Sequence, residues 1–159
     1  MYKLDLSLLF RKYAEKYAKE IKNNIKRRKS LDGSGYSPLK NRRPKGHEQG
    51  INTRLNDTGE FARNAVVFSS DDTSLTVEGN QAMHPTGISY NDIIAYNNMD
   101  SGDTNRNVLI PPKIFPTQES DVSSMKSTEE FSRDLQRAIE IQLGDVAKNL
   151  KLPTIINIG

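Results

Sequence analysis

The chain has 159 residues, of which 35% are hydrophobic and 27% are charged. This length suits one domain with one core, and the low apolar share indicates that long stretches lie outside that core. Cysteine is absent, which excludes disulfide bonds and thiolate metal sites. There is no apolar run long enough to cross a membrane and no secretory signal at residues 1–9, so we expect a soluble protein made in a cytoplasm.

Positive and negative charges are unevenly distributed along the chain. Residues 1–60 contain fifteen Lys and Arg against seven Asp and Glu, whereas residues 61–159 contain eight against thirteen, so the two parts carry net charges of +8 and −5. Such an asymmetry informs on partners rather than on fold. We expect the basic first part to face nucleic acid or an acidic surface of a neighbouring protein.

The first predicted element is a long amphipathic helix at residues 1–31. Its apolar residues recur every three or four positions and therefore occupy one stripe of a helix. The stripe comprises Leu6, Leu9, Phe10, Tyr13, Ala14, Tyr17, Ala18, Ile21 and Ile25. The helix is expected to end near Lys29 to Leu31, because Asp32-Gly33-Ser34-Gly35 favours a turn. Residues 32–61 follow as a basic loop that is poor in apolar side chains.

Residues 62–117 form a predicted β region that begins with a hairpin. Apolar and β-branched residues in Ala62–Ser69 and Ser74–Gly79 indicate its two strands, and Ser70-Asp71-Asp72-Thr73 indicates a four-residue loop between them.

Two further apolar runs follow the hairpin, at residues 93–96 and 108–115. The second run contains Pro111 and Pro112, which cannot lie in a central strand. It is therefore predicted to be an edge strand or a rigid loop that enters the core through Phe115.

The last part of the chain is predicted to be a linker, a helix and a tail. A polar linker at residues 118–126 precedes a helix at residues 127–151, where Ser127 and Glu130 fit a capping box. The apolar stripe of this helix comprises Phe131, Leu135, Ala138, Ile139, Leu143, Val146 and Leu150. Pro153 ends the helix, and residues 152–159 form an apolar, β-prone tail.

This order of elements predicts a single α+β domain over residues 1–159. It consists of a long N-terminal amphipathic helix, a small antiparallel β-sheet with long loops, a C-terminal amphipathic helix packed on the sheet, and an extended C-terminal tail.

The sequence offers little material for catalysis. His47 and His84 both lie in polar, turn-rich sequence without a partner at a diagnostic spacing, so each is interpreted as a solvated loop histidine. Two acidic pairs, Asp71-Asp72 and Glu129-Glu130, are explained by a hairpin turn and by the first turn of a helix. We therefore expect no enzymatic activity, no cofactor, no metal and no small-molecule substrate.

A basic stretch follows the first half of the N-terminal helix. It comprises Lys22, Lys26, Arg27, Arg28, Lys29, Lys40, Arg42, Arg43 and Lys45. One interpretation is contact with phosphate groups of nucleic acid. The other is a solubilising helix end, where cations suit the helix dipole, followed by a solvated loop. The two interpretations have about equal support, because Tyr36 is the only aromatic residue nearby that could stack on a base.

Four short segments contain small motifs in a particular order. They are Asp32-Gly33-Ser34-Gly35-Tyr36-Ser37-Pro38-Leu39, Leu55-Asn56-Asp57-Thr58-Gly59-Glu60-Phe61, Ile93-Ile94-Ala95-Tyr96-Asn97-Asn98 followed by Gly102, and Ile110-Pro111-Pro112-Lys113-Ile114-Phe115. In this order the segments resemble the phage virion-morphogenesis, or tail-completion, family of Mu-like and related tailed phages. Two positions depart from the family pattern: Lys113 stands where the family usually has arginine, and Phe61 replaces an aliphatic residue. Lysine lacks the planar fork of arginine, so a bidentate contact is not expected at this position.

The resemblance implies a structural protein of a tailed-phage virion. Such a protein is a tail-completion, tail-terminator or neck subunit that forms a homo-oligomeric ring, commonly of six, at the head–tail junction. It is assembled in the host bacterial cytoplasm, and its partners are neighbouring neck, connector and tail proteins, with possible non-specific contact to genomic DNA in the lumen.

Two further expectations concern the surfaces of such a ring. Residues Gln118 to Lys126 and the tail residues Ile155, Ile156 and Ile158 are expected to be arms that order on assembly, the tail by adding a strand to a neighbour's sheet. Basic residues are expected to face DNA or acidic neighbours, namely Arg27, Arg28, Lys29, Arg42, Arg43 and Lys45. The alternative function is a small basic nucleic-acid-binding protein. A toxin-like enzyme or nuclease is the third class, and it lacks the acid–base residues that it would need.

Overall fold

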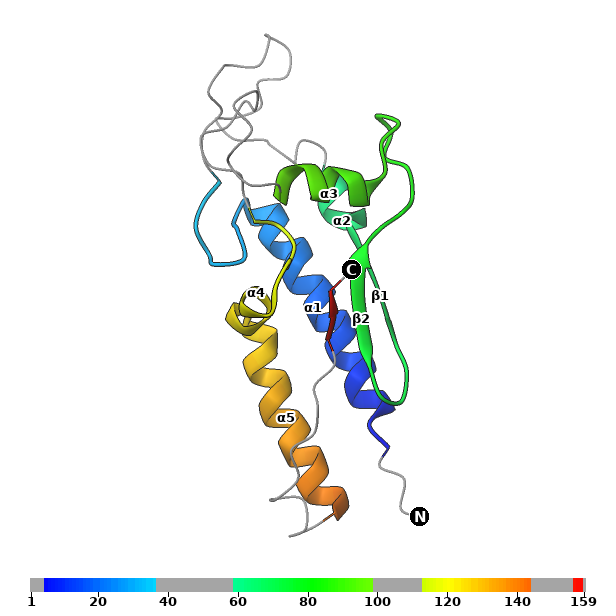
Figure 1. Cartoon of the computed structure of the whole chain (residues 1–159), viewed down its shortest axis with the longest axis vertical. Coiled ribbons are helices and arrows are strands. Elements are labelled where there is room, and N and C mark those ends of the chain that lie inside the picture. The colour runs from blue at the N-terminus through cyan, green and yellow to red at the C-terminus, as the bar shows by residue number, and fades with distance from the viewer. Residues whose placement is uncertain (1–4, 37–58, 99–112, 144–155, 159) are drawn as a thin grey trace.

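The computed structural model describes residues 5–36, 59–98, 113–143 and 156–158. Its helices and strands are α1 (Ser7–Arg27), α2 (Glu60–Asn64), β1 (Val66–Ser70), β2 (Leu75–Gly79), α3 (Tyr90–Asn98), α4 (Glu119–Ser124), α5 (Lys126–Leu143) and β3 (Ile156–Ile158). Figure 1 shows α1 in the middle, with the β1–β2 hairpin on one side and α4 and α5 on the other. The predicted α+β class is confirmed. None of the helices in these ranges is long and apolar enough to cross a membrane.

α1 forms the centre of the core. Every residue of the predicted apolar stripe is buried except Leu9, which is partly buried. The helix ends at Arg27, earlier than predicted, because Arg28 takes the left-handed conformation with φ 57°. The Lys29 amide then donates to the Asn24 carbonyl at 2.9 Å, which is the hydrogen bond of a Schellman-type helix end.

The hairpin is confirmed, with small shifts of its boundaries. β1 and β2 are antiparallel, with Val66 opposite Gly79 and Ser70 opposite Leu75. Residues 71–74 form the loop, where the Asp71 carboxylate accepts bonds from the Thr73 and Ser74 amides, both at 2.7 Å. The first strand does not begin at Ala62, because α2 occupies that position.

The sheet has one covered face and one open face. α1 packs against β1 and β2 and covers Val66, Leu75 and Val77, which are all at most 4% exposed. Side chains of the opposite face point away from α1. They include Val67, which is 39% exposed, and Glu78, which is exposed.

β3 completes the sheet at the β2 edge. Its backbone pairs with β2 in parallel, with Leu75 opposite Ile156 and Val77 opposite Ile158. The predicted tail strand therefore adds to the sheet of its own chain in this structure, whereas the sequence analysis assigned it to a neighbour. Ile155 lies outside the described residues.

The C-terminal helix is confirmed, but its packing partner is α1 rather than the sheet. The Tyr13 and Phe131 rings lie 5.0 Å apart between centroids, and the Tyr13 and Tyr17 hydroxyls donate to Asp134 and Thr128 at 2.6 and 2.7 Å. The apolar stripe of α1 is wide enough to serve two partners, the sheet and α5. As a result α1 is the middle layer of three. The end of the predicted helix, residues 144–151, lies outside the described residues.

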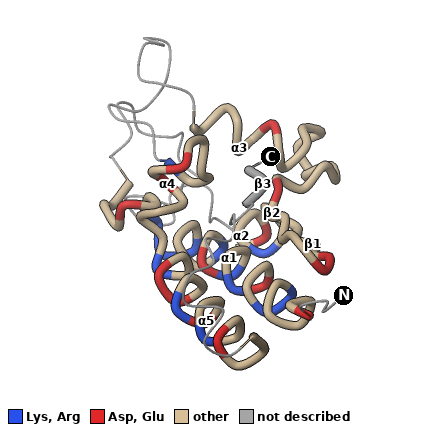
Figure 2. The backbone as a smooth tube through the Cα atoms, turned by 60° about the horizontal axis from the view of Figure 1, so that its bottom comes forward, with Lys and Arg blue, Asp and Glu red and all other residues tan. Residues whose placement is uncertain are grey.

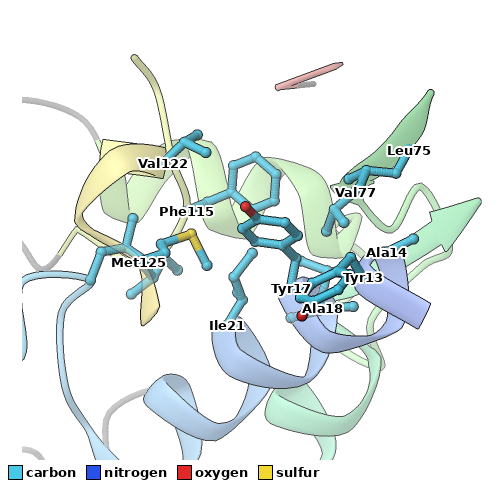
Figure 3. Packing of buried hydrophobic residues seen from close by; sticks show 14 of the residues in the cluster. Tyr13, Ala14, Tyr17, Ala18, Ile21, Leu75, Val77, Phe115, Val122 and Met125 are labelled. Atoms are coloured by element: carbon cyan, nitrogen blue, oxygen red, sulfur yellow. The ribbon is translucent and has the colours of Figure 1, made fainter. Parts of the chain in front are cut away.

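Two segments differ from their predicted conformation. The run at residues 93–96, placed in a β region, belongs to helix α3. Residues 118–126, predicted to be a linker and a free arm, contain helix α4. Val122 of this helix and Met125 directly after it are 6% and 2% exposed. Figure 3 shows the Met125 side chain directed toward Tyr17 and Ile21 of α1, and the Val122 side chain beside Phe115. The arm prediction is therefore wrong for this segment, because its apolar residues belong to the core.

The start of α5 is held by a carboxylate from α1 instead of the predicted capping box. The Glu20 carboxylate accepts bonds from the amides of Lys126 and Ser127 at 2.9 and 2.8 Å and from the Ser127 hydroxyl at 2.5 Å. A carboxylate in this place satisfies free amide groups and complements the helix dipole. Glu130, the other half of the predicted box, pairs with Lys16.

One glycine allows a close approach between α3 and the sheet. A Cβ atom at Gly79 would lie 2.1 Å from the Asn91 side-chain oxygen, which is inside any permitted contact. The Asn91 amide also donates to the Asn80 carbonyl at 2.9 Å. A side chain at position 79 would therefore force the Asn91 side chain to move.

Candidate functional site: a cationic groove beside α1

Within the described ranges, no group of three or more His, Asp or Glu side chains is placed to hold a metal ion. His84 lies on a loop, its Nδ1 is 2.8 Å from the Thr86 hydroxyl, and its ring packs edge-on against Tyr90. Asp71 closes the hairpin turn. Its pKa falls to about 2 because it accepts bonds from the backbone and side chains of Thr73 and Ser74. His47 lies outside the described residues, and the absence of enzymatic activity stays a prediction.

A groove lies between α1, α2 and β1 in the part of the chain that the structure describes. It has a volume of about 490 Å³, within the range of small-ligand and side-chain pockets. Four cationic side chains and one carboxylate line it, together with small or apolar residues. The lining comprises Glu15, Ala18, Lys19, Lys22, Asn23, Lys26, Gly59, Ala62, Arg63 and Phe68.

Helical spacing places the three groove lysines on one stripe of α1. Lys19, Lys22 and Lys26 are three and four residues apart, so they lie above one another along the helix. Lys22 is half-buried, and this burial lowers the pKa of its ammonium group. Neither Lys19 nor Lys22 forms an ion pair with any other described residue. A cation that is partly removed from water without a carboxylate partner favours the approach of an anion.

The far wall of the groove is formed by α2 and β1. Ala62 is buried, whereas Arg63 is exposed and adds a further positive charge. Phe68 on β1 is 44% exposed, which is unusual for a phenylalanine. The groove therefore offers positive charge on one side and an apolar aromatic ring on the other.

The predicted basic residues divide between this groove and the end of α1. Lys22 and Lys26 line the groove. Arg27, Arg28 and Lys29 instead lie where α1 ends and do not line it. The remaining predicted basic residues lie outside the described ranges, namely Lys40, Arg42, Arg43 and Lys45.

Two groove cations were missed by the sequence analysis. Lys19 shares a helical stripe with Lys22 and Lys26, and this spacing was visible in the sequence. Arg63 reaches the groove only because α2 packs against α1, and no local sequence pattern predicts that contact.

Described residues in or next to three of the four motif segments lie close together beyond the C-terminal end of α1. Asp32 accepts bonds from the amide and hydroxyl of Ser34 at 2.8 and 2.6 Å, and Gly33 has φ +84°. Just before this turn, the Leu31 amide donates to the Lys113 carbonyl at 2.9 Å, and the Lys113 amide donates to the Ser30 hydroxyl at 3.2 Å. The two residues just before the first motif segment are therefore hydrogen-bonded to the fourth segment.

The third motif segment joins the same place through Asn98. Its side chain accepts a bond from the Ile114 amide at 2.8 Å and donates to the Phe115 carbonyl at 2.6 Å. Phe115 itself is buried. Asn98 therefore fixes the fourth segment on both sides of Phe115.

Lys113, the position that departs from the family pattern, forms an ion pair. Its ammonium lies 2.8 Å from the Asp121 carboxylate, which also accepts a bond from the Thr117 amide at 3.0 Å. Burial alone would raise the pKa of Asp121, but the bonds from Lys113 and Thr117 outweigh it and lower the pKa. Lys113 therefore attaches its segment to α4.

The second motif segment is only partly described. Gly59 has φ 71° at the start of α2, and the Phe61 ring is buried 5.9 Å from the Tyr90 ring. The other motif positions lie outside the described residues, namely Pro38, Leu39, Leu55, Thr58, Ile110 and Pro111.

The chain matches no protein-family model, no curated protein and no solved structure. The resemblance to the tail-completion family therefore stays a prediction that rests on the motif segments.

Proposed function

We propose that the chain is a structural subunit of a tailed-bacteriophage virion. In this proposal it is a tail-completion, tail-terminator or neck protein that forms a homo-oligomeric ring, of six subunits by preference, at the head–tail junction. It is assembled in the host cytoplasm and contacts neighbouring neck, connector and tail proteins. The role is structural and requires no cofactor.

The observation that carries this proposal is that the third and fourth motif segments meet each other and the two residues just before the first segment. Residues 30–31, Asn98 and residues 113–115 are far apart in the sequence, yet hydrogen bonds join them at one joint. Segments that resemble a family in order, and that also depend on one another in space, are better explained by a shared architecture than by chance turns. The convergence therefore supports the resemblance.

Exposed apolar side chains supply a second argument, because a ring subunit needs surfaces that neighbours cover. Leu8 and Ile141 are 81% and 77% exposed, at the ends of α1 and α5 that lie together. The open face of the sheet adds Val67. Separate patches of this kind suit the heterologous contacts that close a ring.

The decisive experiment is the mass and symmetry of the purified full chain. Light scattering is expected to give a multiple of the 17.9 kDa chain mass, six by preference, and negative-stain images are expected to show rings. A protein that stays monomeric up to about 0.1 mM, well above the micromolar range in which specific interfaces form, would refute ring formation. Ile141→Asp, which changes an exposed residue, is expected to lower the assembled fraction without changing the circular dichroism spectrum.

A virion role also predicts a phenotype for the basic residues. Reversal of Arg27, Arg28, Arg42 and Arg43 to glutamate is expected to impair head–tail joining while heads and tails still form. Unimpaired infectivity of such a variant would reduce these arginines to solubilising residues.

The second candidate function is a small nucleic-acid-binding protein, which the cationic groove favours. Four groove cations that each neutralise a phosphate would give a salt dependence with a log–log slope of about −3 to −4. Duplex DNA binding with this slope, retained by the monomeric fraction of the Ile141→Asp variant, would support this candidate. A lack of binding at about 50 mM salt would remove it.

A further inference from the structure

The open edge of β1 lies beside the cationic groove. In the part of the chain that the structure describes, β1 pairs only with β2, so its other edge has no strand partner. An edge strand with free backbone groups is a template for another strand.

The hairpin register fixes which backbone groups face this edge. The Asp71 amide donates to the Ser74 carbonyl at 3.0 Å and the Asn80 amide to the Ala65 carbonyl at 2.9 Å. Hydrogen-bonded pairs alternate along an antiparallel ladder, so Val67 and Ser69 bond across to β2. The amide and carbonyl groups of Phe68 and Ser70 therefore point outward.

Phe68 links the edge to the groove. Its backbone belongs to the outward-facing set, and its ring lines the groove beside the α1 lysines. Successive side chains of a strand alternate between the two faces of a sheet. Every second side chain of a strand added at β1 would therefore point to the same face as Phe68, where Lys19, Lys22 and Lys26 stand.

The spacing of the two elements is compatible with this arrangement. Figure 1 shows α1 passing the hairpin at an oblique angle. Same-face residues of a strand repeat about every 6.6 Å. Lys22 and Lys26 are separated by about 6 Å along the helix axis. Acidic residues at two alternate positions of an added strand would thus match the spacing of Lys22 and Lys26.

From this geometry we infer that the β1 edge and the cationic groove together bind an extended acidic segment of a partner protein, which adds to the sheet as a strand. Acidic side chains at alternate positions face Lys19, Lys22, Lys26 and Arg63, and the peptide backbone bonds to Phe68 and Ser70. Main-chain bonds supply affinity and the alternating side chains supply specificity. The inference does not depend on ring formation, because a monomer presents the same edge.

A nucleic acid explains less of this surface. Phosphate groups could pair with the groove cations. A nucleic acid has no peptide backbone, however, so it could not form β-sheet hydrogen bonds with the outward amide and carbonyl groups of β1. Single-stranded nucleic acid usually stacks on several aromatic rings, and this groove holds one, Phe68. The combination of edge and charge therefore favours a peptide.

The test is fluorescence anisotropy of labelled eight-residue peptides with the full chain. The main probe alternates Glu with Val, and a second peptide has Lys in place of Glu. We expect the Glu peptide to bind and the Lys peptide not to bind. The Lys22→Glu/Lys26→Glu variant should weaken binding at least about tenfold, as expected for a reversed charge pair at an interface. Lys126→Glu/Arg137→Glu on α5 makes the same change in net charge away from the groove and should leave binding unchanged.

Methylation of the peptide backbone distinguishes strand addition from electrostatic binding that involves no main-chain hydrogen bonds. Two versions of the Glu peptide carry N-methyl groups on either the odd or the even residues, so only one set loses the amides that face β1. We expect one version to lose binding at least about tenfold and the other to retain it. Equal binding of both would overturn the inference. A single-stranded oligothymidylate of equal charge that bound more tightly than the Glu peptide would overturn it too, and would assign the groove to nucleic acid.

Discussion

Lysines lie on two sides of α1, and those on the α5 side form ion pairs with a neighbouring helix. On the α5 side, Lys12 lies 3.0 Å from Asp134, and Lys16 pairs with Glu130. On the groove side, Lys19 and Lys22 have no such carboxylate within the described ranges. Figure 2 shows blue and red segments on both α1 and α5. The same helix therefore uses its charges for internal packing on one side and offers them to a ligand on the other.

This difference distinguishes charged side chains that pair within the fold from charged side chains that can contact a ligand. Exposed ion pairs contribute little individually, at most about 1 kcal/mol. On the α5 side they surround a tight apolar and hydrogen-bonded contact, in which Tyr13 packs on Phe131 and donates to Asp134. On the groove side, the side chains of Lys19 and Lys22 form no ion pair or hydrogen bond with any other described residue. Substitutions on the α5 side should therefore affect stability, and substitutions on the groove side should affect binding.

The largest expected effect comes from one phenylalanine on each side. Phe131 is 1% exposed and lies against the Phe10 and Tyr13 rings, so Phe131→Ala should cost about 3–5 kcal/mol in the free energy of unfolding. Phe68 is 44% exposed, and Phe68→Ala should cost only about 1 kcal/mol. Urea unfolding followed by circular dichroism measures both values. Equal losses would mean that the groove wall belongs to the core and that the two sides do not differ as proposed.

The next effect concerns two glutamates of α1. Glu20 accepts two backbone amides and a hydroxyl at the start of α5, so Glu20→Ala should cost about 1–2 kcal/mol, the typical effect of losing a helix cap. Glu15 lines the groove and is exposed, so Glu15→Ala should change stability by less than about 0.5 kcal/mol. The Glu15 variant should instead bind the acidic peptide more tightly, because it removes the one carboxylate of the groove. A Glu20 variant as stable as the wild type would show that α5 begins without this carboxylate.

Periodicity and turn chemistry predicted the local elements well. The three-and-four spacing from Leu6 to Ile25 located α1, because one partner or another covers each residue of that stripe. Asp71 and its neighbours located the hairpin turn, because the bonds that close it are local. The sequence therefore contained the information for these elements within a few residues of each.

Long-range contacts decided the features that the sequence analysis missed. Ser127 and Glu130 fit a capping box, but Glu20, more than one hundred residues away, took the amides instead. Val122 and Met125 looked like part of a polar linker, because two isolated apolar residues give no period, and α1 supplied the surface that buries them. Arg63 joined the groove by the same kind of distant packing. Candidate sites that form between distant elements in this way cannot be predicted from the local sequence of any one element.

The smallest expected effect is a change in the pKa of Asp134, the carboxylate on α5 that bonds to α1. It is compared with Asp71, whose bonds all lie within its own turn. Hydrogen bonds lower the pKa of Asp134 to about 2. The bond from the Tyr13 hydroxyl has the largest effect and the bond from the Lys12 ammonium the next. An unfolded aspartate has a pKa of about 3.9. Because the folded value is depressed, this carboxylate stabilises the fold above pH about 4, and the contribution is lost as the pH falls toward about 2. Tyr13→Phe removes the strongest of these bonds and should raise the Asp134 midpoint, measured by carboxyl-carbon NMR. Asp71, with a pKa of about 2 set by bonds within its own turn, is the internal control and should not move. An unchanged Asp134 midpoint would show that Tyr13 contributes packing alone to the contact with α5.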